Sequence, residues 1–186
     1  MRLRLGIPTD QIPILRQVYF QTYGTTLLGL QYNFQIDPKD FLAFVHDLPI
    51  EEMLSPDSAL CDMLNSLPQA KWIFTNADDK HATRVLRALG LEACFSGIID
   101  INALDFICKP SPNAYRQAMQ IAGVVDPARC VYLDDSPRNL LPAQGMGFFT
   151  VLVSQAGQEP AANLVIGRPH DLPNALPGLW DSPTLQ

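Results

Sequence analysis

The spacing of hydrophobic residues divides the chain into two parts. In residues 1–55, apolar side chains recur every three or four positions from Ile12 to Tyr19 and again after Pro38, which predicts two helices. The segment Tyr23–Leu30 between them contains two glycines and is interpreted as a turn-rich joint. No segment of this part has the pattern of a strand, so we expect it to be helical.

From Pro56 onward, helical spacing alternates with short, continuously apolar segments. The apolar segments predict strands over 71–75, 97–100, 130–134, 148–153 and 164–166. Helices are expected over 60–67, 79–89, 113–122, 137–143 and 171–176. Apolar strands that alternate with helices are typical of a parallel sheet covered by helices. Residues 56–180 are therefore predicted to form an α/β domain, with 181–186 as a tail.

Composition and charge narrow the range of functions. The net charge of −6 argues against a broad surface for nucleic acid polymers or for anionic membranes, although a local cationic pocket for one phosphate is compatible with it. The sequence has neither an apolar run long enough to span a bilayer nor a secretory signal, so we expect a cytoplasmic protein. The scattered cysteines, Cys61, Cys94, Cys108 and Cys130, are expected to be buried thiols rather than disulfides or metal ligands.

Three groups of polar residues follow predicted strands. Thr75 and Asn76 offer donors for phosphate oxygens, or a cap for the next helix. Lys109, in a proline-rich loop, offers a charge for a phosphate, or is a solvated surface residue. Asp134 and Asp135 repel each other unless a cation such as Mg²⁺ offsets them, although a helix-capping Asp with a solvated neighbour fits the same pattern. Because ligands bind beyond the carboxyl ends of parallel strands, we expect the three groups to meet.

In this order the three groups resemble motifs two, three and four of the haloacid dehalogenase superfamily. Similarity to the pyrimidine 5'-nucleotidase branch of that superfamily comes from Tyr23-Gly-Thr-Thr-Leu-Leu-Gly-Leu30, Phe74-Thr-Asn-Ala-Asp78 with His81, Cys108-Lys-Pro, Asp134-Asp-Ser-Pro-Arg-Asn139 and Leu179-Trp180. The resemblance implies a Rossmann-like parallel sheet with helices on both faces and a helical cap, of which residues 1–55 would form most. It also implies a phosphatase that hydrolyses nucleoside monophosphates with Mg²⁺ through an aspartyl-phosphate.

The resemblance also implies roles for the residues that match the motifs. Thr75 and Asn76 would contact the phosphate, and Lys109 would neutralise it and orient the nucleophile. Asp134 and Asp135 would hold Mg²⁺, one of them directly and the other directly or through water.

In the cap, the resemblance implies that Tyr23, Thr25 and Thr26, with Tyr19 and His46, help to select the nucleoside. The spacing of Tyr19 and Tyr23 is equally typical of core packing. Because the cap sets the substrate, sugar phosphates and other small phosphates stay open beside nucleotides.

The chain contains no Asp-x-Asp-x-Thr, the superfamily's first motif. In the superfamily its first Asp attacks phosphorus and its second is the general acid and base, on a strand at the centre of the sheet. Asp37 and Asp40 are too far apart, and Asp100 lies between motifs two and three. We therefore expect the first, central strand to be missing, no turnover by the chain as given, and self-association through unpaired sheet edges. Either the chain is a fragment, which the intact later motifs favour, or the motif was lost naturally.

Three other functions match parts of the pattern. The main alternative is a non-catalytic phosphate- or metal-binding protein that acts through a partner. A receiver domain places its acidic pair before its Thr and Lys, which is the reverse of the order here. A dinucleotide-binding oxidoreductase needs a G-x-G-x-x-G turn before a helix, whereas Gly145-Met-Gly147 precedes a predicted strand.

Overall fold

The computed structural model describes residues 1–155 and 160–181. The chain divides into two compact units, Met1–Leu48 and Pro49–Gln186. Residues 49–55, which the sequence assigned to the helical part, group with the second unit, in which the Arg84 guanidinium pairs with the Glu51 carboxylate at 2.9 Å. The tail predicted over 181–186 lies outside the described residues except for Asp181.

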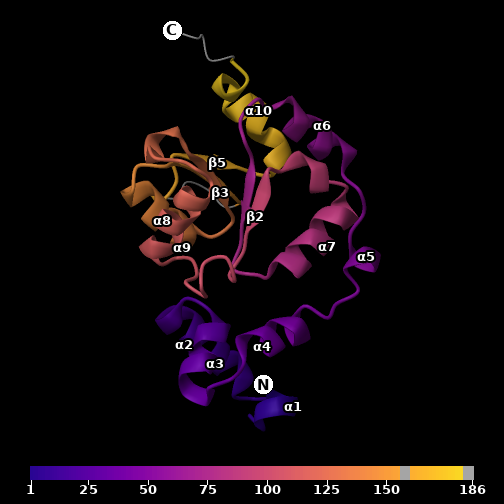
Figure 1. Ribbon diagram of the computed structural model, residues 1–186, viewed down its shortest axis with the longest axis vertical. Helices are drawn as coiled ribbons and strands as arrows, with labels where there is room; N and C mark the ends of the chain where they lie inside the picture. The colour runs from indigo at the N-terminus through magenta and orange to yellow at the C-terminus, as the bar shows by residue number, and fades with distance from the viewer. Residues whose placement is uncertain (156–159, 182–186) are drawn as a thin grey trace. The chain divides into compact units, whose positions relative to one another are not determined.

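The first unit is helical throughout (Figure 1). Its helices are α1 (Arg2–Leu5), α2 (Ile12–Tyr23), α3 (Thr26–Phe34) and α4 (Pro38–Val45). The buried side chains of Ile7, Tyr19 and Leu30 form its core.

The joint predicted over Tyr23–Leu30 is wrong in extent, because most of that segment is the first half of α3. Only Gly24, with a φ of 90°, and Thr25 separate α2 from α3. The Thr25 hydroxyl caps α3 by accepting a hydrogen bond from the Leu28 amide. The second glycine, Gly29, lies inside α3, where a Cβ would come within 2.3 Å of Cγ of Tyr19. That glycine therefore permits close packing of α2 on α3 rather than a turn.

In the described residues of the second unit there are five strands, all paired in parallel. β1 (Trp72–Phe74) pairs with β2 (Gly97–Ile99), and β3 (Val131–Asp134), β4 (Phe149–Val153) and β5 (Leu164–Ile166) pair in that order. The strands form two sheets, and within the described residues β1 and β3 each have a single hydrogen-bonded neighbour. In the part of the chain that the structure describes, no strand pairs with the other edge of β1 or of β3.

The helices of the second unit agree closely with the predicted segments. They are α5 (Ile50–Met53), α6 (Ser58–Ser66), α7 (Asp79–Leu89), α8 (Pro112–Ile121), α9 (Pro137–Gly145) and α10 (Leu172–Ala175), with 3₁₀ turns η1 (Glu92–Cys94), η2 (Pro127–Arg129), η3 (Pro169–Asp171) and η4 (Pro177–Leu179). Asp57 and Asp78 cap α6 and α7, and Gly90 ends α7 with a φ of 71°. Among the described residues, no helix has the length and apolar character that crossing a bilayer requires.

Side chains join the two sheets where strand pairing does not. On the face covered by α8 and α9, Phe74 of β1 packs against Tyr115 of α8 and Tyr132 of β3, with ring centres 5.3 and 6.0 Å away. On the opposite face, Ile73 of β1 and Leu133 of β3 both pack near α6. Figure 1 shows α8 and α9 on one side of the strands and α6 and α7 on the other. The fold is therefore a parallel α/β arrangement with helices on both faces, as the sequence predicted.

Candidate functional site

The predicted polar groups lie together at the carboxyl ends of β1 and β3. The Lys109 ammonium donates to the main-chain oxygen of Phe74 at 2.8 Å and to Oδ2 of Asp134 at 2.9 Å. Lys109 therefore connects the ends of two strands that do not pair with each other. Its side chain is only 9% exposed, so the alternative of a solvated surface lysine is wrong.

Aromatic rings complete the surroundings of this ammonium group. Nζ of Lys109 lies 4.8 Å from the ring centre of Phe74 and 5.5 Å from that of Tyr132. The negative face of an aromatic ring attracts a cation, and a buried charge is tolerated where it is paired and hydrogen-bonded. The protein thus holds a desolvated positive charge at the end of β1.

Asn76 fixes the loop that carries this lysine. Its Oδ1 accepts a hydrogen bond from the Lys109 amide at 2.8 Å, and its Nδ2 donates to the Lys109 main-chain oxygen at 3.0 Å. The side chain of Asn76 is therefore engaged both as a hydrogen-bond acceptor and as a donor. A direct contact between Asn76 and a phosphate, which the motif suggested, would require one of these bonds to open.

Thr75 and Asp100 organise the neighbouring strand ends. The Thr75 hydroxyl accepts from the Ala77 amide at 3.0 Å, which leaves its own proton available for an acceptor such as a phosphate oxygen. Asp100, directly after β2 and 5% exposed, accepts from the amides of Asp79 and Ala103 at 3.0 and 2.8 Å. Asp100 thereby ties the start of α7 to the loop after β2.

Asp134 receives hydrogen bonds at both of its carboxylate oxygens. Oδ2 accepts from Lys109 and from the Tyr132 hydroxyl, and Oδ1 accepts from the Ser136 amide at 2.9 Å and from Nδ2 of Asn139 at 3.0 Å. Burial acts to raise the pKa of Asp134, but the charge of Lys109 and the hydrogen bonds outweigh it, so the pKa is lowered. Asp134 is therefore a buried carboxylate that stays ionised.

Tyr132 and Asp100 are site residues that the sequence interpretation left out. Burial and the neighbouring Asp134 carboxylate raise the pKa of the Tyr132 hydroxyl, so that it remains a hydrogen-bond donor. The sequence does indicate that Tyr132 lies beside Asp134. The two residues are two positions apart on one strand, and side chains at that spacing lie on the same face of the sheet. The sequence carries a similar signal for Asp100, which follows an apolar strand as Asp134 does.

Asp135 differs from its neighbour in being exposed. Two adjacent carboxylates, one buried and one exposed, are hard oxygen donors of the kind that suits Mg²⁺, which keeps several waters and takes one or two carboxylates plus phosphate oxygens. In the described part of the chain, no group of three or more acidic, His or Cys side chains is placed to hold a metal. The donor set at Asp134 and Asp135 thus fits Mg²⁺ only with water or substrate oxygens as the remaining ligands.

The other predicted substrate residues belong to the first unit. Tyr23 packs against Tyr19 and Tyr32, with ring centres 5.9 and 5.4 Å away. Thr25 caps α3, Thr26 is the first residue of that helix, and His46 ends α4. Tyr19 is 7% exposed, so core packing explains its place in the sequence. The roles of Tyr23, Thr25 and Thr26 toward a substrate stay predictions.

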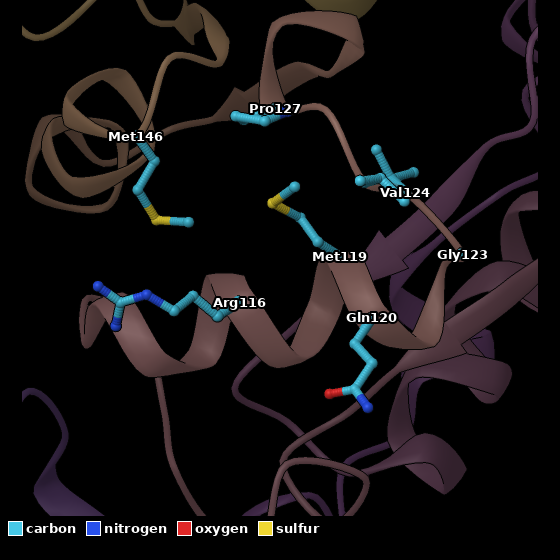
Figure 2. Close-up of a pocket in the computed structure, with 8 residues that line it drawn as sticks. Arg116, Met119, Gln120, Gly123, Val124, Pro127 and Met146 are labelled. Carbon is cyan, nitrogen blue, oxygen red and sulfur yellow. The ribbon is translucent and has the colours of Figure 1, made fainter.

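A separate hollow of about 460 Å³ lies near the C-terminal end of α8. Its lining is mostly apolar, and Figure 2 shows the Met119 and Met146 side chains on either side of it. Pro127 precedes β3 and Met146 precedes β4, so the hollow lies at the amino ends of these strands. It is therefore distinct from the polar residues at the carboxyl ends.

Comparison with protein families gives a match over most of the chain. Residues 15–147 match the family described as haloacid dehalogenase-like hydrolase. Phosphate metabolism protein 8 of Saccharomyces cerevisiae is 32% identical over 165 residues, which are 81% of this chain and 51% of that protein. The chain thus spans about half the length of this curated relative.

Several solved structures have a fold similar to that of this chain. They include L-2-haloacid dehalogenase from Xanthobacter autotrophicus with chloropropionic acid covalently bound (TM-score 0.61, 19% identity, 88% of this chain and 81% of that chain). A HAD phosphatase from Thermococcus onnurineus is also similar (TM-score 0.57, 22% identity, 88% of each chain). A third is the HAD hydrolase YfnB from Bacillus subtilis bound to magnesium (TM-score 0.61, 16% identity, 91% and 84%). At these identities the likeness concerns the fold.

Proposed function

Because this chain belongs to the haloacid dehalogenase-like hydrolases, we propose that its strand-end site serves the Mg²⁺-dependent hydrolysis of phosphate monoesters. The observation that carries the proposal is the Lys109–Asp134 pair, a buried cation 2.9 Å from a buried carboxylate that is followed by an exposed one. A cation in this position complements the negative charge of a phosphoryl group. The name of the yeast relative, phosphate metabolism protein 8, agrees with this class of substrate.

Each site residue then has a distinct task. The Thr75 hydroxyl donates to a phosphate oxygen, and Lys109 neutralises phosphate charge. Asn76 holds the Lys109 loop through its two hydrogen bonds rather than binding phosphate itself. Asp134 and Asp135 hold Mg²⁺, which when bound polarises the phosphoryl oxygens. For Asp134 this requires that one of its oxygens exchange a present donor for the metal.

The substrate that we propose is a nucleoside monophosphate, with pyrimidine nucleotides first. This choice is supported by the resemblance of the motifs to the pyrimidine 5'-nucleotidase branch, including the segment that carries Tyr23, Thr25 and Thr26. We place the site in the cytoplasm, where Mg²⁺ and nucleotides are both available.

We further propose that the 186-residue chain by itself does not turn over. An aspartyl-phosphate mechanism needs an attacking carboxylate, and the chain contains no Asp-x-Asp. In the described residues, the one carboxylate that contacts the Lys109 ammonium is Asp134, which is fully engaged by donors. The outer edges of β1 and β3, which flank Lys109, are where a strand bearing that carboxylate would pair. The same edges would support self-association, which sedimentation over a range of concentrations would detect.

The test separates binding from turnover. Phosphate, uridine monophosphate and ribose 5-phosphate are titrated into the purified chain by calorimetry with Mg²⁺ and with EDTA, and phosphate release is followed in parallel. We expect Mg²⁺-dependent binding of the phosphate compounds, and we expect Lys109→Met to abolish it. Uridine monophosphate should bind more tightly than ribose 5-phosphate, and no phosphate should be released. Clear hydrolysis would overturn the proposed inactivity. Absence of Mg²⁺-dependent binding in a folded chain would overturn the proposed site, and tighter binding of the sugar phosphate would overturn the nucleotide preference.

A further inference from the structure

A pair of thiols connects α6 to the turn before β2. Sγ of Cys61, in α6, lies 3.4 Å from Sγ of Cys94, the last residue of η1. The Cys94 sulfur is also 3.9 Å from the main-chain oxygen of Cys61. Both cysteines are free thiols in the structure. A disulfide has an S–S length of about 2.05 Å, so the two sulfurs need to approach by little more than one ångström.

We propose that Cys61 and Cys94 are an oxidation site, at which a peroxide converts the two thiols reversibly to a disulfide. The Cys61 sulfur attacks one oxygen of hydrogen peroxide, the O–O bond breaks, and Cys61 becomes a sulfenic acid while the other oxygen leaves as water. The Cys94 thiol then attacks the Cys61 sulfur, an S–S bond forms, and a second water is released. Two thiols lose two electrons and two protons, and the peroxide takes them up.

The surroundings of Cys61 and Cys94 indicate different chemical roles for the two thiols. Cys61 is the more accessible one and its sulfur accepts a hydrogen bond from Nδ2 of Asn65 at 3.4 Å, so Cys61 meets the oxidant first. Cys94 is 4% exposed, and burial raises the pKa of its thiol despite the nearby charge of Lys71. Cys94 is therefore protected from direct oxidation and serves as the resolving thiol.

The position of the pair gives the disulfide a structural effect. The bond would link residues 33 positions apart and close a loop that contains β1, Thr75, Asn76 and α7. β1 and β2 are three residues each, and a two-stranded sheet of that size is marginal without support. A cross-link at its base constrains the unfolded chain and so stabilises the part of the fold that carries Thr75 and Asn76.

The test uses wild-type chain treated with hydrogen peroxide and then with an alkylating reagent. We expect a mass loss of about 2 Da per chain before alkylation, one tryptic species that links Cys61 to Cys94, and reversal by dithiothreitol. The melting temperature under non-reducing conditions should rise by roughly 5 °C or more relative to the reduced chain. The variant Cys61→Ser should show neither the mass loss nor the rise, whereas Cys130→Ser should behave like the wild type.

Three results would overturn the proposal. The first is a folded, peroxide-treated wild type in which both thiols still alkylate. The second is sulfinic acid at Cys61 without a link to Cys94, and the third is a link from either residue to another cysteine or another chain. Because these results are read from the wild type, they do not depend on whether a serine variant folds.

Discussion

The side chain of Asn76 and the backbone of Lys109 form a reciprocal pair of hydrogen bonds, 2.8 and 3.0 Å long. Asn76 follows β1 and Lys109 lies in the loop before α8, so the pair fixes two loops that are 33 residues apart in sequence. The ammonium of the same lysine then reaches the ends of β1 and β3. The amide of Asn76 therefore determines where the cation of the site is held.

Replacement of Asn76 should cost stability because it leaves two main-chain groups of Lys109 without their partners. For Asn76→Ala we expect a loss of about 1–3 kcal/mol in the free energy of unfolding, measured by urea denaturation. Asn113→Ala is the matched control, since Asn113 is exposed and its Oδ1 accepts a hydrogen bond from the exposed Arg116 at 2.7 Å. This substitution should change stability by less than about 0.5 kcal/mol. Equal effects of the two substitutions would contradict the assigned role of Asn76.

Loss of Lys109 should destabilise the protein by leaving the Asp134 carboxylate buried without its cation. We expect Lys109→Met to cost about 3–5 kcal/mol, and the double variant Lys109→Met/Asp134→Asn to cost less than Lys109→Met alone. Urea denaturation of the wild type, both single variants and the double variant gives the coupling between the two residues. Simple additivity would show that the ion pair does not couple them.

Protonation of Asp134 should weaken the fold in acid. Because its pKa is lowered in the folded state, the unfolded chain binds the proton more readily, and the contribution to stability is present above about pH 4. It is lost as the pH falls from there through the lower pKa of the folded state. Stability measured from pH 6 down to pH 2 should therefore decline less steeply in Asp134→Asn.

Glu51 also contributes to the loss of stability in this range of acid pH, so its contribution needs a control variant of its own. The hydrogen bond from Arg84 lowers the pKa of Glu51 to about 2. Glu51→Gln should therefore flatten part of the decline between about pH 4 and pH 2 while leaving the Asp134 part in place. An unchanged profile in both variants would contradict the pH assignments.

Removal of the Tyr132 hydroxyl should change the pKa of Asp134 and leave the packing of the aromatic ring intact. Tyr132→Phe keeps the aromatic ring against Phe74 and deletes one donor to Oδ2, so we expect a loss of about 1 kcal/mol and a higher pKa of Asp134. Tyr115→Phe is the control, because Tyr115 lies in the same cluster but donates to the main-chain oxygen of Asn139. NMR titration of the Asp134 carboxyl should show the rise in Tyr132→Phe alone.

The helices and strands of this fold could be predicted from local sequence, whereas the hydrogen-bond partners of the site residues could not. The periods of apolar residues specify strands such as Val131–Asp134 and helices such as Asp79–Leu89, because each element buries its own face. The prediction of a turn at Gly29 is wrong because a glycine that allows a neighbouring helix to pack closely cannot be distinguished locally from one that forms a turn.

Hydrogen bonds between distant loops leave no periodic signal. The sequence placed Asn76 and Lys109 at one edge of the sheet, but it gave no indication that they bond to each other instead of both facing a phosphate. Likewise, the pair Asp134 and Asp135 suggested a shared role, yet one is buried with four donors and the other is exposed. Such differences depend on which hydrogen-bond donors the folded chain brings next to each carboxylate.

The division of the strands into two sheets has a consequence for cooperativity. β1 and β2 are connected to β3, β4 and β5 through Lys109 and the aromatic rings, with no main-chain ladder between β1 and β3 in the described residues. Backbone amides of the two sheets can therefore open in separate steps. In native-state hydrogen exchange, the amides of Trp72–Phe74 should exchange at a lower free energy than those of Phe149–Val153, so that this small domain behaves as two foldons.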